Sequence, residues 1–377
     1  MALFLLIFFL IYGGFHFYFF LKVREAFAPG AAAQAIIIAL LILGMMTPII
    51  VRASERYGFE MPARLMSWTG YLWMAILLLF FSASILFEFY RFLAHLAGWT
   101  LRTNVGVFLP SPRMLFFIPA AVALGIVLYG AFGARCIRSE YLVIHSAKIP
   151  KEQGRLRIVQ ISDVHAGVLV RGGYLENILR KIREAAPDLL VSTGDLVDGQ
   201  GNDLSESAAR LREIRPRYGK FAVTGNHEFY TGIDKAIEFT ASSGFTMLRG
   251  STATVAGVVD LTGVDDPAFR SSGSPGPSDR EILSRAGGGH FTILLKHQPL
   301  VEKDAPGSFD LQLSGHTHKG QIFPFSLITR LVFPFHAGNY RLTGGSLLHV
   351  SRGSGTWGPP VRFLAPPEIT VIDLMPG

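Results

Sequence analysis

Aspartate, asparagine and histidine side chains gather at five places in the later part of this 377-residue chain, in groups that could hold metal ions. The groups are Asp163-Val164-His165, Gly194-Asp195-Leu196-Val197-Asp198, Gly225-Asn226-His227-Glu228, Lys296-His297-Gln298-Pro299 and Gly315-His316-Thr317-His318. Oxygen and imidazole donors without thiolate suit Mn, Fe or Zn rather than a structural zinc site. One carboxylate can bridge two cations about 3.5–4 Å apart, a spacing suited to displacement at phosphorus. The residue types therefore indicate metal-assisted phosphoryl chemistry.

The five groups share a position, because each follows a short run of β-forming residues. The runs before them are Leu156–Ile161, Leu189–Val191, Phe221–Val223, Phe291–Leu295 and Leu311–Leu313, and further runs lie at Val255–Val264, Leu347–Val350 and Ile369–Ile372. In an open sheet the carboxyl ends of strands converge on the ligand crevice, so the groups can meet in space. One Asp-x-His pair alone is weak evidence for a ligand. Five groups in equivalent positions predict one shared site.

The elements that must position this site form an α/β domain over residues 155–377. Between the first two runs, Tyr174–Ala185 places apolar residues at helical spacing. A stretch of about 220 residues is long enough to bury a core of its own. The chain contains one cysteine, Cys136, which excludes an intramolecular disulfide framework and a cysteine-based metal cluster.

The residues before this domain have a different composition. Only 12 of the 63 charged residues precede position 134. Four uncharged apolar windows are long enough to cross about 30 Å of hydrocarbon as helices of roughly 20 residues. They are Ala2–Leu21, Ala32–Val51, Leu65–Phe87 and Met114–Ala134. We predict a membrane domain of about four transmembrane helices over residues 1–134 and a linker over residues 135–154.

Two ionisable residues lie within or beside these windows, and charges within a membrane often mark a function. Glu88 is followed by Arg91 at the end of a window, and His16 stands as a lone histidine among aromatic residues, which indicates no proton or ion path. We interpret both as structural, since a transporter would need more such groups. This predicts an integral protein, of the plasma (inner) membrane, whose spans serve as an anchor.

The side of the membrane on which the later domain lies depends on the distribution of basic residues. The loops on one side carry five lysines and arginines and those on the other side carry six, so this count does not favour either orientation. The first window has no charge before it and two cations, Lys22 and Arg24, after it. This favours an outside amino terminus and an exported carboxy-terminal domain, and the exported side is our expectation.

The five groups in this order resemble the calcineurin-like metallophosphoesterases, whose signature is Asp-x-His, Gly-Asp-x-x-Asp, Gly-Asn-His-Glu or Asp, a histidine, and Gly-His-x-His. The resemblance covers roughly Leu156–Leu374 and implies a four-layer α/β/β/α sandwich. Residues 315–322 and 350–355, with Pro360-Val361-Arg362 and residues 366–369, are similar to the YkuE- and YaeI-like membrane-associated branch. Lys319 departs from that branch, which usually has glycine at this position.

The resemblance also implies roles for single residues. The first of two divalent metal ions (Mn, Fe or Zn) would be held by Asp163, His165, Asp195 and His318. The second would share Asp195 and add Asn226, His297 and His316. His227 would be the catalytic residue that protonates or stabilises the leaving oxygen. Asp198 would orient the site, although a role as a capping carboxylate in the following loop is an open alternative. Arg352 is a candidate phosphate contact, because guanidinium matches phosphate geometry.

The resulting hypothesis is a membrane-anchored phosphoesterase in which a hydroxide held between two cations attacks a phosphate ester or pyrophosphate. Because the site is tethered to a bilayer, we expect a phosphorylated lipid, or a lipid-linked nucleotide such as UDP-diacylglucosamine, as substrate. The alternatives are a general phosphodiesterase or phosphatase merely anchored by its spans, and a membrane sensor with a non-catalytic domain. No basic stripe with interleaved aromatics indicates nucleic acid as a partner. The oligomeric state stays open.

Overall fold

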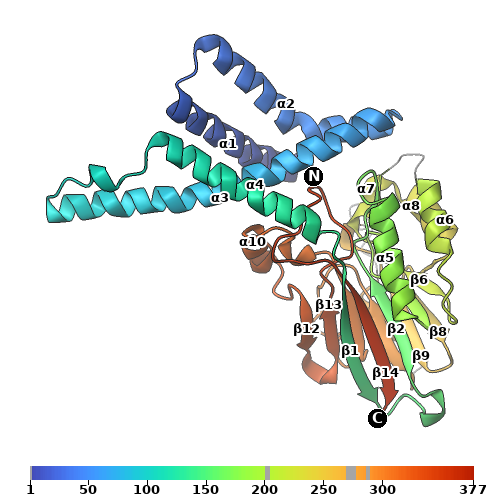
Figure 1. Ribbon diagram of the computed structural model, residues 1–377. Coiled ribbons are helices and arrows are strands. Elements are labelled where there is room, and N and C mark those ends of the chain that lie inside the picture. Colours follow the sequence, from blue (N-terminus) through green and yellow to red (C-terminus); the bar gives the residue numbers. More distant parts are fainter. Residues whose placement is uncertain (1, 200–203, 269–276, 286–288) are drawn as a thin grey trace. The chain divides into compact units, whose positions relative to one another are not determined.

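The computed structural model describes residues 2–199, 204–268, 277–285 and 289–377 (Figure 1). The chain divides into two compact units. The membrane unit comprises Met1–Phe132 with Gly358–Val361, and the catalytic unit comprises Gly133–Trp357 with Arg362–Gly377.

The membrane unit contains four long apolar helices in its described residues. They are α1 (Ala2–Phe27), α2 (Ala31–Arg56), α3 (Glu60–Leu101) and α4 (Pro112–Gly133), with a short 3₁₀ turn η1 (Gly106–Phe108) between the last two. All four are long and apolar enough to cross a membrane, as predicted. Helix α3 differs from its predicted window of Leu65–Phe87. It has 42 residues, which at 1.5 Å per residue is about twice the thickness of the hydrocarbon core.

The polar residues of the membrane unit pair with one another. The indole Nε1 of Trp73 on α3 lies 3.1 Å from His16 Nε2 on α1. Lys22 Nζ is buried and lies 2.6 Å from Glu88 Oε1 and 2.9 Å from Glu25 Oε2. Such pairs bind helices together where lipid offers no hydrogen-bonding partner. These contacts support the structural interpretation of His16 and Glu88.

The catalytic unit is built on two six-stranded sheets. The first sheet has the order β1-β14-β2-β4-β6-β7, with strands at Arg138–Ser146, Glu368–Pro376, Leu156–Ile161, Leu189–Ser192, Lys220–Ala222 and Thr246–Met247. The second has the order β12-β13-β11-β10-β9-β8, with strands at Gly338–Arg341, Leu347–Val350, Leu311–Ser314, Phe291–Leu295, Val259–Gly263 and Ser251–Val255. Strands β3 (Ala166–Gly167) and β5 (Val197–Asp198) form a small separate pair.

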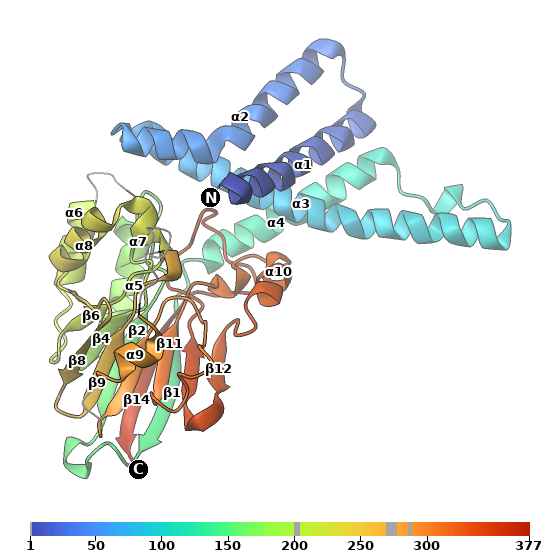
Figure 2. The same cartoon turned by 180° about the vertical axis from the view of Figure 1, so that it is seen from behind.

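Two apolar cores hold these layers together. The first packs helices α5 (Gly172–Ala185), α6 (Leu204–Arg212) and α8 (Ile233–Ser242) against one face of the first sheet. The second lies between the two sheets and includes Leu156, Leu261 and Leu313. On the outer face of the second sheet, Leu294 and Phe309 pack with residues of the short helix α9 (Asp279–Leu283) (Figure 2). The predicted four-layer α/β/β/α sandwich is confirmed, with a thin fourth layer among the described residues.

The segment expected to be a linker contains a strand. Strand β1 pairs in parallel with β14 from Arg138 opposite Glu368 to Ser146 opposite Pro376. As an edge strand it buries only Ile144 fully, so it does not need the kind of β-forming apolar run from which the buried strands were predicted. Part of residues 135–154 therefore belongs to the sheet.

Candidate metal centre

The five groups of metal-ligand residue types lie in loops that follow parallel strands. They come after β2, β4, β6, β10 and β11, which pair in parallel within their own sheets. Helix α7 (Asn226–Thr231) begins directly at the third group. The structure thus brings together residues separated by more than 150 positions, as the strand-end argument predicted.

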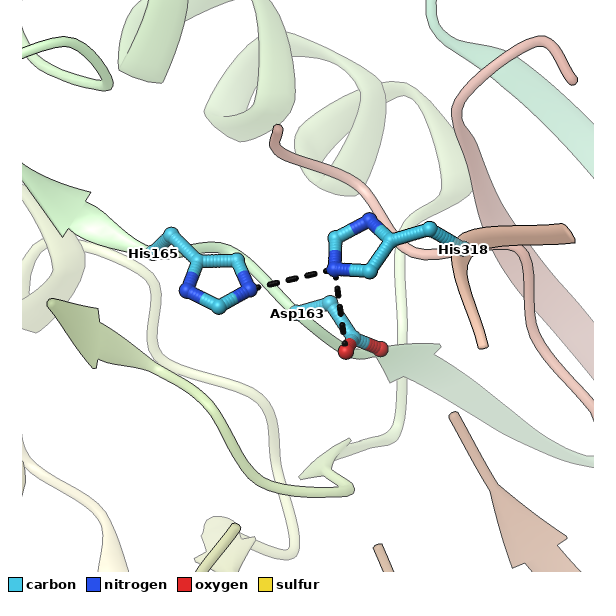
Figure 3. A group of neighbouring side chains, drawn as sticks. All are labelled: Asp163, His165 and His318. Atoms are coloured by element: carbon cyan, nitrogen blue, oxygen red, sulfur yellow. Dashed lines mark hydrogen bonds and ion pairs between the residues drawn. The ribbon is translucent and has the colours of Figure 1, made fainter. Parts of the chain in front are cut away.

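Asp163, His165 and His318 form the first cluster, in which donor atoms point toward one another (Figure 3). His318 Nε2 lies 3.1 Å from His165 Nε2 and 3.4 Å from Asp163 Oδ1. All three side chains are buried. Two imidazole nitrogens facing a carboxylate at this distance form a donor set for a divalent cation.

Asp195, His297 and His316 form the second cluster. His297 Nε2 lies 3.2 Å from Asp195 Oδ2, 3.1 Å from His316 Nδ1 and 3.2 Å from Asn226 Oδ1. Asp195 Oδ2 is also 3.8 Å from His165 Nε2, on the first cluster. This carboxylate therefore lies between the two clusters, where a bridging ligand would have to be.

Most of the expected ligands have an unusual backbone conformation. Asp163, His165, Asp195, His316 and His318 all have positive φ angles, between 48° and 72°. This left-handed conformation destabilises the backbone of a non-glycine residue by about 1–2 kcal/mol. Such strain collects at functional sites, where surrounding packing maintains it. Five of the seven expected metal ligands are thus held in a geometry that local preference opposes.

The protonation states suit cation binding for three of the histidines. Burial lowers the pKa of His165 to about 4 and that of His316 to about 3. Burial, together with the charge of Arg362, holds the pKa of His318 well below its usual range. Neutral imidazole is the form that binds metal. These three residues therefore need not lose a proton at neutral pH.

Asp195 and His297 form a charged pair at the centre of the site. Burial disfavours both charges, but the charge of His297 and of neighbouring imidazoles holds the pKa of Asp195 well below its usual range. The carboxylates of Asp195 and Asp163 likewise outweigh burial and hold the pKa of His297 well above its usual range. A cation would replace the proton on His297, which makes affinity for metal rise with pH. The donor types, their convergence and these charges fit two divalent cations.

Close packing explains two of the glycines in the motifs. A Cβ on Gly225 would overlap the Asp195 carboxylate, and one on Gly315 would overlap the side chains of Ser162 and Asp163. Only glycine lets these loops approach the ligands so closely. The structure also places Lys319 at a φ of 52°, which gives a physical reason for the glycine usual at this position in the branch that the sequence resembles.

His227 lies beside both clusters. Its ring centroid is 4.6 Å from that of His165, and its Nδ1 is 3.1 Å from Asp198 Oδ1. Burial opposes the charged form of His227, but Asp198 and Asp195 outweigh it and raise its pKa to about 9. His227 is thus placed to carry a proton at neutral pH, and Asp198 is placed to orient it.

Sequence reasoning gave no role to Glu228, which joins two ligand loops. Its carboxylate accepts hydrogen bonds from the backbone N–H groups of Gly225 (2.7 Å), Asp195 (3.0 Å) and Leu196 (2.7 Å). Glu228 is the last residue of the Gly-Asn-His-Glu motif, so the motif did include it. Its carboxylate has a structural role rather than the role of a metal ligand. Glu228 fixes the position of Asp195 relative to the helix that carries Asn226 and His227.

The arginine that touches the cluster is Arg362, not Arg352. Arg362 is buried, and its Nη2 lies 2.9 Å from His318 Nδ1 while its Nη1 donates to the carbonyl oxygen of Arg352 at 2.7 Å. The Arg352 guanidinium instead forms ion pairs with Glu140 and Glu368 and donates to the Pro366 carbonyl. The structure therefore engages Arg352 within the first sheet, where strands β1 and β14 pair, and does not direct it toward the metal cluster.

We predict that acid weakens the fold through His349, a histidine outside the five groups. Its buried ring contacts Asn339 Oδ1 at 2.6 Å and Thr370 Oγ1 at 2.9 Å. Burial, with the charge of Arg352, lowers its pKa to about 4. Between pH 6.5 and 4 the imidazole of His349 binds a proton in the unfolded chain but not in the folded chain. The free energy of unfolding therefore decreases as the pH is lowered through this window, by at most about 3 kcal/mol.

The measurement is thermal unfolding of the full chain in detergent at pH 7 and pH 5, for the parent protein and His349→Gln. The variant has no imidazole to protonate at position 349, so its apparent Tm should drop less on acidification than that of the parent. An equal drop in the two proteins would show that His349 does not contribute to acid sensitivity.

Comparison with known proteins adds to this geometry. Residues 156–320 match a family model described as calcineurin-like phosphoesterase. An uncharacterized metallophosphoesterase of Aquifex aeolicus is 37% identical over 253 residues, which are 66% of this chain and 97% of that protein. A transmembrane protein with metallophosphoesterase domain from Danio rerio is 36% identical over 60% of this chain and 55% of its own length. The uncharacterized metallophosphoesterase YkuE of Bacillus subtilis is 34% identical over 61% of this chain and 83% of its own length.

Proposed function

The chain belongs to the calcineurin-like metallophosphoesterases, a family of metal-dependent phosphoester hydrolases, and on that premise we propose that it is a membrane-anchored enzyme with a dinuclear metal centre. The observation that carries this proposal is the position of Asp195. Its Oδ2 lies 3.2 Å from His297 Nε2 in one cluster and 3.8 Å from His165 Nε2 in the other. A single carboxylate oxygen facing both clusters supports two cations rather than one.

We assign the ligands by this arrangement. Asp163, His165, Asp195 and His318 would hold one cation, and Asp195, Asn226, His297 and His316 the other. The two ions, Mn, Fe or Zn, would activate a water molecule and neutralise charge on the phosphate oxygens. His227 would hold a proton for the leaving oxygen, and Asp198 would keep that imidazole charged and oriented.

We propose a lipid-bearing phosphate as the substrate class. Four helices of the chain are long and apolar enough to cross a membrane, and four residues separate the end of α4 at Gly133 from the start of β1 at Arg138. A catalytic unit tethered so closely meets amphiphilic phosphates at high local concentration. A phospholipid or a lipid-linked nucleotide such as UDP-diacylglucosamine, cleaved at its pyrophosphate, satisfies this condition.

Removal and return of metal tests the chemistry. Purified full-length protein treated with a chelator should lose hydrolysis of an aryl phosphate diester, and Mn, Zn or Fe should restore it. Metal analysis should give two ions per chain in the active protein. Full activity in a chelated, metal-free sample would refute the dinuclear proposal.

A comparison of substrates tests the lipid assignment. The full chain in vesicles should hydrolyse a lipid phosphate or lipid-linked pyrophosphate faster than a soluble analogue with the same headgroup. Equal turnover of the two would favour a general phosphodiesterase that its spans merely anchor. The metal experiment and the substrate experiment can thus fail independently.

A further inference from the structure

Helix α10 (Phe325–Val332) of the catalytic unit exposes its apolar side chains. None of its eight side chains is buried. Leu331 is 85% exposed and Val332 is 64% exposed, and Phe325, Leu327 and Ile328 are also exposed. Apolar groups of this size clustered on a surface mark an interaction site.

The polar face of α10 is turned toward the protein and its apolar face outward, whereas an ordinary surface helix has the reverse orientation. Its five apolar residues cover one half of the helix circumference, and Ser326, Thr329 and Arg330 occupy the other half. Ser326 packs on Gly320, so closely that a Cβ on this glycine would overlap the Ser326 backbone. A polar position therefore faces the protein while the apolar half faces outward. The packing of α10 within the catalytic unit does not explain its apolar residues.

This apolar surface begins beside the metal cluster. Phe333, the residue after α10, has its ring centroid 5.0 Å from that of the ligand His316. The hydroxyl of Thr317, between the last two ligands, donates to the His336 carbonyl at 2.6 Å. Both views of the molecule show α10 at the same end of the sheets as α7, which carries His227 (Figures 1 and 2). Whatever binds α10 is adjacent to the reaction site.

The charge around α10 identifies the kind of partner. No aspartate or glutamate occurs from Gln312 to Pro367, a stretch that includes Lys319, Arg330 and Arg341. Cations beside an apolar helix face are the chemistry of a helix that lies in the headgroup region of an anionic bilayer. A bilayer is also the surface that the four long apolar helices of the same chain would bring close to α10.

We propose that α10 docks on the anionic surface of the bilayer to which the chain is anchored, with its apolar half among the acyl chains and Lys319 and Arg330 at the headgroups. The short connection from α4 to β1 keeps such a surface within reach. The docked helix places the rim of the metal cluster at the level of lipid phosphates. This surface is a feature of the fold and does not depend on which phosphate is hydrolysed.

Site-directed fluorescence tests the proposal on the full chain. Cys136, the one native cysteine, is replaced by serine, and Leu331→Cys is labelled with an environment-sensitive fluorophore. Ser251→Cys, at an exposed position on β8, is the matched control. In vesicles of phosphatidylcholine and phosphatidylglycerol, spin-labelled lipids should quench the Leu331 label several-fold more than the Ser251 label. Aqueous iodide should show the opposite preference.

Charge reversal supplies the second measurement. Arg330→Glu should weaken lipid quenching at position 331 in phosphatidylglycerol vesicles, whereas Arg180→Glu, at an exposed position on helix α5, should not. Equal lipid quenching at positions 331 and 251 would overturn the proposal. So would a position-331 label shielded from both quenchers, because this means that protein, either the chain's own membrane helices or a second copy, covers α10. The readout needs no turnover, so it stands apart from the test of the metal centre.

Discussion

The Asp195→Asn variant should lose turnover by roughly two orders of magnitude or more. Among the residues that we assign as ligands, Asp195 faces both clusters, and its carboxylate also accepts a hydrogen bond from the backbone N–H of His227 at 2.8 Å. An amide keeps the size of this side chain but removes its negative charge, and its NH₂ group cannot be a ligand. The loss therefore reaches both cation sites at once.

The measurements are kcat and the metal content per chain, determined on the same preparation of full-length protein. Glu206→Gln, on helix α6, makes the same carboxylate-to-amide change at an exposed ion pair with Arg210 and should retain normal values of both. Near-normal turnover of Asp195→Asn with two bound ions would refute the bridging role. An unchanged unfolding temperature of Asp195→Asn would show that the loss of turnover comes from the site and not from a destabilised fold.

His227→Gln should also lose roughly two orders of magnitude in turnover, but without losing metal. His227 is buried beside both clusters and pairs with Asp198, and it is not among the ligands that we assign. If it gives a proton to the leaving oxygen, its loss matters most when that oxygen is strongly basic. The defect should therefore be larger for an alkyl phosphate ester than for a nitrophenyl ester.

The test compares the two esters for the parent protein, His227→Gln and a control, His290→Gln. His290 is half-buried and lies 3.1 Å from Asp260 on the second sheet, so its change should leave kcat for both esters unchanged. A metal-depleted His227→Gln protein would identify this residue as a ligand instead. An equal defect for both esters would argue against proton donation.

The local sequence was sufficient for the strands that carry the site. Runs such as Leu156–Ile161 and Phe291–Leu295 coincide with β2 and β10, because strands buried in the interior are rich in apolar and β-branched residues. Strand β1 was missed, since an edge strand with one buried residue has a weak pattern. Helix α3 was predicted too short, because hydropathy marks where a helix can cross lipid but not where its hydrogen bonds end.

The donor types, their order along the chain and their positions after strands can be read from the amino-acid sequence, and from these the metal-dependent chemistry follows. The contacts of the two arginines depend on the fold, in which Arg362 lies against His318 and Arg352 pairs with Glu140 and Glu368. The outward direction of the apolar half of α10 also depends on the fold. Donor chemistry belongs to each side chain, whereas an ion pair or a packing face depends on residues far away in sequence. The left-handed backbone of five expected ligands shows the same dependence, because distant contacts hold a conformation that local preference disfavours.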